Sequence, residues 1–237
     1  FALLHPVLIA VILIGGILIY FHIPLESYDK GGDLITLFLS PVTAVLAYEI
    51  YRQRKTLASY FLPVIVGCAV GSGVSLFSVT LFCRLFGLSE EITASILAKS
   101  VTTPIAVEIT GMTGGIPSLT VVVVVLTGIM GAVLSPVLIK LFHIKSKVAA
   151  GVAIGTCSHA IGTSKAIELG QTQGAMSGIS IGISGIVTVA FVMIMATLPD
   201  LKPVMASPVY SEPEPAVPMS YIKFIILATL ASFRLYT

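Results

Sequence analysis

The segment Lys99–Pro104, with the sequence KSVTTP, places a cation, three hydroxyl groups and a proline inside an apolar stretch. Pro104 lacks an amide hydrogen and disfavours helical backbone at Thr103, so a helix through this stretch must break or kink there. In a membrane, the freed backbone groups need protein or a water-filled cavity beside them. A half-helix beginning at Pro104 would also point the positive end of its dipole to the same place as Lys99. These features favour an anion-binding site over a plain proline kink whose hydroxyl groups only satisfy the backbone. The candidate ligands are Lys99, Ser100, Thr102 and Thr103.

A second polar segment, Gly155–Glu168, has the sequence GTCSHAIGTSKAIE. Its small residues permit close helix packing, which explains the glycines but not a histidine, a lysine and a glutamate together. Histidine exchanges protons near neutral pH, although a lone histidine is more often a structural residue. Both roles therefore stay open for His159. The candidate ligands here are Ser158, His159, Thr163, Ser164 and Lys165, and the candidate proton-coupling groups are His159, Glu108 and Glu168.

Neither segment has the pattern of an enzyme. Ser158 and His159 are neighbours without a surrounding nucleophile elbow, which argues against a serine hydrolase. Cys157 and His159 lack the further ligands of a zinc site. Cys68, Cys83 and Cys157 show no metal-ligand spacing and no pairing pattern. The sequence predicts buried reduced thiols, and it predicts no cofactor, no metal and no enzymatic activity.

The composition is that of an integral membrane protein. Of the 237 residues, 56% are hydrophobic and only 10% are charged, whereas a soluble domain has about a quarter charged residues. Residues 58–83, 116–139 and 174–199 contain no charge, and each run exceeds the ~20 residues that a membrane-spanning helix needs. Residues 3–21 form a fourth apolar run. The net charge of +2 is too small to indicate nucleic-acid binding.

Shorter segments that contain proline or charged residues precede these runs. They are residues 34–51, 92–109 and 148–169. Residues 42–50 align without gaps on residues 101–109, with five of nine positions identical, and residues 161–169 match more weakly. The chain is therefore predicted to repeat one unit, a broken segment followed by a full span.

The basic residues suggest how these units lie in the membrane. One basic cluster comprises Arg52, Arg54 and Lys55, and another comprises Lys140, Lys145 and Lys147. Both clusters are cytoplasmic, as basic loops tend to be, only if residues 92–109 enter the membrane and return. Consecutive units would then be inverted, as in many secondary transporters. A discontinuous helix that crosses the membrane remains the open alternative. The predicted fold is all-α, a polytopic membrane protein with broken or re-entrant helices and inverted repeats.

Three motifs in order resemble the LrgB/CidB family. They are KSVTTPIA at Lys99–Ala106, GGIPSLT at Gly114–Thr120 and GTCSHAIGT at Gly155–Thr163, and the resemblance runs from about His5 to Leu198. It implies a multi-pass protein of the bacterial inner (plasma) membrane, described as antiholin-like or as an effector of murein hydrolase export. Relatives include the plastidial glycolate/glycerate translocator and bacterial proteins linked to pyruvate uptake. The resemblance also implies a small LrgA-like membrane partner.

The same resemblance guides the domain boundaries. Residues 1–199 are predicted to be the membrane domain, without the hydrophobic segment that usually opens this family. Residues 200–220 contain five prolines and are predicted to be a linker. Residues 221–237 are predicted to be a short apolar tail that is not a regular part of the fold.

Two functions follow from these patterns. The first is a carrier of small monocarboxylates such as pyruvate, glycolate or lactate, with proton coupling as an open feature. The second is a holin/antiholin-like regulator of cell lysis, which would act through oligomers. The first is favoured, because a lesion-forming oligomer needs no charged, broken segment inside each chain. The expected partners are a small carboxylate anion, the lipid bilayer, an LrgA-like protein and further copies of this chain, but no nucleic acid.

Overall fold

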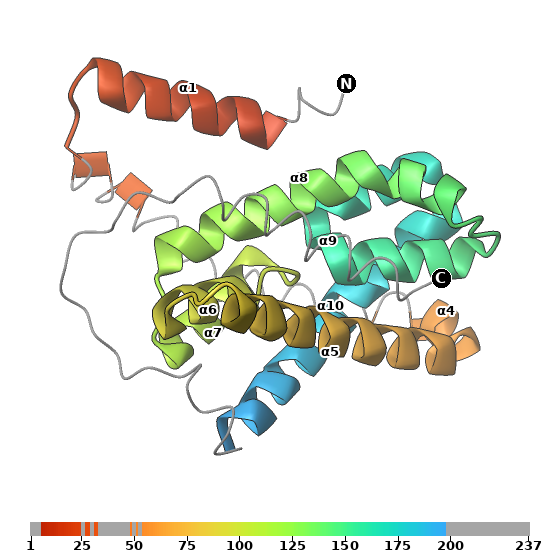
Figure 1. The fold of residues 1–237 in the computed structure, drawn as a ribbon. Helices are drawn as coiled ribbons and strands as arrows, with labels where there is room; N and C mark the ends of the chain where they lie inside the picture. Colours follow the sequence, from red (N-terminus) through yellow and green to blue (C-terminus); the bar gives the residue numbers. More distant parts are fainter. Residues whose placement is uncertain are drawn as a thin grey trace. The chain divides into compact units, whose positions relative to one another are not determined.

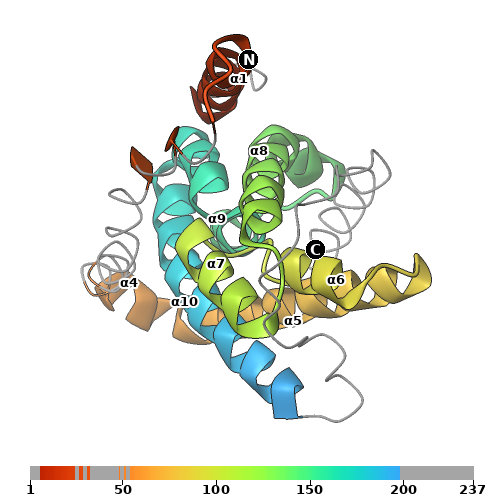
Figure 2. The ribbon, with the colours of Figure 1, turned by 90° about the vertical axis from the view of Figure 1, so that its left-hand side faces the viewer.

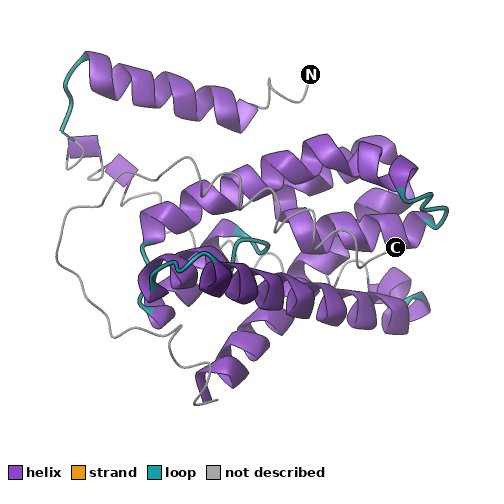
Figure 3. Ribbon diagram, in the orientation of Figure 1, coloured by secondary structure: helices purple, strands orange, loops and turns teal. Residues whose placement is uncertain are grey.

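A computed structural model describes residues 6–24, 27–28, 31–32, 48, 51 and 54–197 of the chain. Its regular elements in this part are eight helices and no strand (Figures 1 and 3), which confirms the all-α prediction. The chain divides into two units, residues 1–48 and 49–237. In the first, α1 spans Pro6–Tyr20. The proline at its start suits the first helical position, where no amide hydrogen is needed.

The second unit contains three long helices at the places where uncharged runs predicted them. They are α5 (Phe61–Leu85), α8 (Pro117–Leu141) and α10 (Gln171–Thr197). At about 1.5 Å per residue, each exceeds the ~30 Å hydrocarbon core of a bilayer. Large apolar side chains are exposed on all three, among them Phe77, Val137 and Ile186. Such surfaces suit lipid, so the described residues form a helical membrane protein.

Short helices lie between the long ones. They are α4 (Arg54–Ser59), α6 (Glu90–Leu97) and α7 (Thr103–Thr113), and a longer helix, α9, spans Lys147–Leu169. Ser89 caps α6 by accepting a hydrogen bond from the Ile92 amide, and two glutamates follow in the first turn. Gly114 ends α7 in the left-handed conformation that favours glycine.

Two of these segments are interrupted. The stretch 92–109 is divided between α6 and α7 by the non-helical residues 98–102, as Pro104 predicted. Within α9, His159 has φ 40° and ψ −142°, so two shorter helices meet there. The first predicted broken segment, residues 34–51, lies outside the described residues apart from Tyr48 and Tyr51. Pro41 and Glu49, which belong to this copy of the predicted repeat, therefore also lie outside them.

In the second unit, α9 packs against α10, α8 and α5. It runs opposite to α8, and the two are joined at the right of Figure 1. The end-on view in Figure 2 shows the short helix α7 in front of α10 and beside α8. Glycine permits the closest approach: a Cβ atom on Gly155 of α9 would lie 2.3 Å from the Ser177 carbonyl oxygen of α10. This packing brings the interruption of α9 into the interior.

Candidate functional site

Lys99 lies in the gap between α6 and α7, and none of its surface is exposed. Its Nζ donates a hydrogen bond of 3.3 Å to the Ser100 hydroxyl. Ser100 in turn shares a 2.8 Å hydrogen bond with Ser75 of α5. No carboxylate of the described residues lies within ion-pair distance of Lys99. A buried ammonium without a counter-charge destabilises the protein. A bound anion would supply that counter-charge.

The start of α7 adds hydrogen-bond donors to the same gap. Thr102 is its N-cap residue with extended backbone, φ −64° and ψ 148°, and its carbonyl accepts from the Ala106 amide at 2.9 Å. The Thr102 side chain makes no cap bond, and its buried hydroxyl has no hydrogen-bond partner. The first amides of a helix have no partner within the helix. Thr103 is half-buried beside them.

The interruption of α9 is held by the imidazole of His159. The His159 side chain is 3% exposed, and its Nε2 lies 2.9 Å from the carbonyl oxygen of Val124 in α8. A carbonyl oxygen only accepts, so Nε2 carries the hydrogen. A non-glycine residue at such backbone angles costs about 1–3 kcal/mol and persists only where its surroundings impose it.

Two glycines of α8 make room for this turn of α9. A Cβ atom on Gly128 would lie 2.7 Å from Cε1 of His159, and one on Gly131 would overlap the Ser158 hydroxyl. Ser158 is fully buried, and its hydroxyl has no hydrogen-bond partner. A second unpaired donor therefore lies at the second interruption.

Burial and charge relate the two interruptions. Lys99 and, about sixty positions on, Ser158 and His159 are all buried, and the ammonium of Lys99 is close enough to Cys157 and His159 for their charges to interact. Each interruption also has a buried hydroxyl without a hydrogen-bond partner, on Thr102 at one and on Ser158 at the other. Lys99, Thr102, Ser158 and His159 are together called the buried region.

Other predicted site residues lie outside this region or have different partners. Thr163 donates to the His159 carbonyl at 2.9 Å and pairs with the Ser177 hydroxyl at 2.7 Å, so it joins the interruption to α10. Lys165 forms a 2.5 Å ion pair with Glu168 one turn along α9. This hydrogen bond and the lysine charge hold the pKa of Glu168 below its usual range. Ser164 and Glu108 are exposed.

Comparison with known proteins agrees with the motifs. The sequence matches the model of the LrgB-like family over residues 1–198. The chain belongs to the LrgB-like family. It is 39% identical over 183 residues to the uncharacterized protein YxaC of Bacillus subtilis, covering 77% of this chain and 80% of that protein. It is 37% identical to the uncharacterized protein YwbG of the same organism, covering 77% and 81%. No solved structure matches the chain significantly.

Several residues at the site of this LrgB-like protein were missed by sequence reasoning. Ser75, the Val124 carbonyl and the two glycines of α8 come from spans that appeared to be plain apolar helices. The only signal in the sequence was the pair Gly128 and Gly131, which lie on neighbouring positions of one helical face.

The thiols of this LrgB-like chain behave as predicted. Cys68, Cys83 and Cys157 are free and buried. Cys68 accepts from the Thr156 hydroxyl at 3.5 Å and lies 3.8 Å from the Ser180 carbonyl oxygen. The described residues contain no group of histidine, cysteine and acidic side chains that could hold a metal ion.

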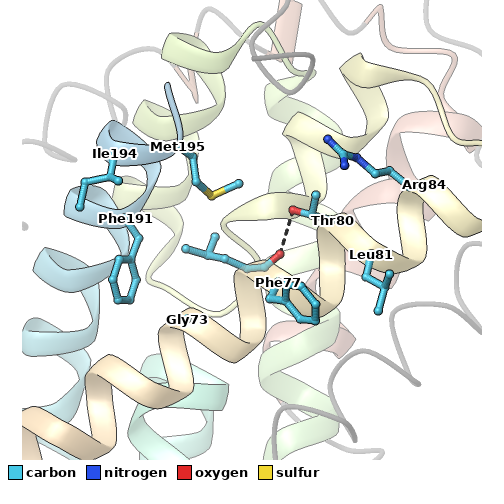
Figure 4. Close-up of a pocket in the computed structure, with 9 residues that line it drawn as sticks. Gly73, Phe77, Thr80, Leu81, Arg84, Phe191, Ile194 and Met195 are labelled. Carbon is cyan, nitrogen blue, oxygen red and sulfur yellow. Dashed lines mark hydrogen bonds between the residues drawn. The ribbon is translucent and has the colours of Figure 1, made fainter. Parts of the chain in front are cut away.

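An apolar groove elsewhere in the second unit is lined by residues of α5 and α10. It has a volume of about 300 Å³, and Phe77 and Phe191 line it (Figure 4). The Thr80 hydroxyl beside it donates to the Leu76 carbonyl at 2.9 Å. None of the predicted site residues lines this groove.

Proposed function

We propose that this protein carries small monocarboxylate anions across the bacterial plasma membrane, with pyruvate, glycolate and lactate as the class of substrate. The observation that carries the proposal is Lys99, which is wholly buried at a helix break and has no carboxylate partner among the described residues. Charged residues inside membrane domains are rare, and they mark substrate and ion pathways.

The chemistry of the buried region supports a carboxylate as ligand. Ionised carboxylate oxygens accept hydrogen bonds and do not donate them. The region offers an ammonium, the hydroxyls of Thr102 and Ser158, and the first amides of α7. Ser100, Thr103 and His159 complete the proposed set. A 2-oxo or 2-hydroxy group beside the carboxylate would accept from the remaining hydroxyls. One unpaired cation matches one negative charge, because the second candidate cation, Lys165, already pairs with Glu168.

The order of elements supports a repeat as the framework of this carrier. In the first unit of this repeat, the short helix α6 is followed by a break and then by the short helix α7. A turn at Gly114 leads from α7 to the long helix α8. The two halves of α9 and then α10 follow the same order, with Gly170 at the turn. We extend the proposal to an inverted relation between these units, with residues 34–83 as a further copy. A substrate site at the interface of such units is typical of secondary transporters.

The test is uptake of radiolabelled pyruvate, glycolate and lactate by the purified protein in proteoliposomes. We expect saturable uptake by the wild type and none above empty liposomes for Lys99→Ala. The matched control is Lys145→Ala, because Lys145 is exposed. Uptake by folded Lys99→Ala at the wild-type rate would remove the site assignment.

The alternative function is a holin/antiholin-like regulator of murein hydrolase export, acting with an LrgA-like partner or as a homo-oligomer. A regulator of this kind needs no substrate site within each chain. The same proteoliposomes separate the two functions. Release of an encapsulated dye without saturable carboxylate uptake would support the regulator and contradict the carrier.

A further inference from the structure

The surroundings of Lys99 set a requirement on its charge during transport. When no anion is bound, the ammonium has one hydroxyl partner, Ser100, and no counter-charge among the described residues. A charged group in this position must either hold an anion or become neutral, because an uncompensated buried charge is strongly disfavoured. A lysine can meet this requirement, since its ammonium can release a proton, whereas a guanidinium cannot.

The groups that face Lys99 do not supply the missing charge. Cys157 and His159 of α9 are the titratable groups that interact with it, and a charged imidazole would add a second cation. From α5, the neutral Ser75 reaches Ser100, which is the hydroxyl partner of Lys99. The charged residues of the packed helices α5 to α8 are exposed: Arg84, Glu90, Glu91, Glu108 and Lys140. Helix α10 contains no charged residue.

We infer that Lys99 is the proton-coupling group of the proposed carrier, so that each monocarboxylate crosses the membrane together with one proton. The inference rests on the proposed function. On the loading side, the Lys99 amine takes a proton from water and the ammonium then binds the carboxylate. On the other side the carboxylate leaves, the N–H bond breaks, and the proton passes to water. The empty carrier returns with a neutral lysine, and the whole cycle moves no net charge.

This assignment gives His159 a different role from the proton carrier considered for it. Its Nε2 hydrogen is donated to the Val124 carbonyl, so the imidazole fixes the interruption of α9 against α8. Glu108 and Glu168 are exposed. A neutral imidazole that donates from Nε2 can still accept a proton on Nδ1, but an imidazolium at the buried His159 would add a second cation near Lys99 without a counter-charge among the described residues.

The experiment uses the full chain in proteoliposomes with labelled pyruvate as the probe. Net uptake is driven by an inward proton gradient, and a potassium diffusion potential is set with valinomycin in parallel samples. A pH-sensitive dye inside the vesicles counts the protons that enter. We expect one proton per pyruvate and the same uptake rate at every imposed potential. Acceleration by an inside-positive potential, or uptake without proton entry, would overturn the inference.

The variant Lys99→Arg separates binding from proton release. Its guanidinium can hold a carboxylate but keeps its charge, so the empty carrier cannot return. We expect exchange of internal for external pyruvate to continue at a reduced rate, while the ratio of net uptake to exchange falls about tenfold or more. Lys145→Arg is the matched control. A wild-type ratio in Lys99→Arg contradicts the inference but leaves the proposed function standing.

Loss of both reactions in Lys99→Arg would also count against the inference, because a guanidinium that holds a carboxylate is expected to keep exchange. Absence of both exchange and uptake in the wild type would instead refute the proposed function itself.

Discussion

Replacing Lys99 by methionine should stabilise the protein while abolishing carboxylate binding. Methionine keeps an unbranched side chain of similar length and removes the ammonium. The Ser100 hydroxyl keeps Ser75 as its partner at 2.8 Å, so no hydroxyl loses its only hydrogen bond. The change therefore removes an uncompensated buried charge and leaves its polar neighbours satisfied.

The size of the effect has an upper limit. An ordinary lysine can always become neutral, which at pH 7 costs about 5 kcal/mol for a pKa of about 10.4. Replacing buried ionic groups by apolar ones of similar volume commonly stabilises proteins by about 1–4 kcal/mol. Methionine is one heavy atom shorter, and the gap it leaves costs up to about 1 kcal/mol. For a chain of this length we expect a Tm rise of about 2–4 °C for each kcal/mol gained.

The free cysteines supply the assay. Cys68, Cys83 and Cys157 are all buried, so a thiol-reactive fluorophore reports unfolding without a label on the native protein. We expect Lys99→Met to unfold at a higher temperature than the wild type, and Lys145→Met to stay within about 0.5 kcal/mol of it. Saturating pyruvate should raise the Tm of the wild type, as any ligand of the folded state does, but not that of Lys99→Met. A lower Tm for Lys99→Met would show that the ammonium has stabilising partners, and the reasoning for an anion site would fail.

Three further predictions test the neighbouring residues. Gly128→Ala should reduce uptake and destabilise the fold by about 1–3 kcal/mol, because the added Cβ would lie 2.7 Å from His159 Cε1. The control is Gly73→Ala, whose Cβ would lie at an ordinary 3.5 Å from Phe191. Equal thermal shifts and equal uptake for the two variants would contradict this prediction. His159→Gln should lower uptake at every pH without changing the shape of the pH profile between pH 5 and 8, and a changed shape would return proton coupling to the imidazole. Glu168→Gln should leave that profile unchanged, because Lys165 keeps the pKa of Glu168 low and its stabilising contribution is lost only as the pH falls through that low value; a shifted profile would show that Glu168 takes part in coupling.

The predictable parts of this protein are those with a local chemical cause. The three long helices follow from uncharged runs, because a bilayer accepts no other segments of that length. The break between α6 and α7 follows from Pro104, whose ring removes a hydrogen bond and restricts the preceding residue. The sequence also places Lys99 in the apolar stretch beside that break, and in the structure the lysine there has no exposed surface.

Other features depend on packing and have no local signal. Lys165 and Glu168 appeared to belong with His159 because all three occupy one short segment. On a helix, residues three apart are neighbours, so these two satisfy each other at the surface. The contacts from Ser75 and Val124 could not be predicted, because which faces of two long helices meet is decided by tertiary packing and not by either sequence alone.

The interruption of α9 is the clearest case of packing overriding local preference. No proline lies in this helix, and the residue with left-handed backbone is a histidine. The strain is offset by contacts from two other helices. The Val124 carbonyl of α8 accepts from the ring, for which Gly128 leaves room. Ser177 of α10 pairs with Thr163, which donates to the His159 carbonyl. The residue that interrupts the helix is also close enough to Lys99 for their charges to interact. Any movement that straightens α9 must release the imidazole from α8 and change the surroundings of the ammonium at the same time.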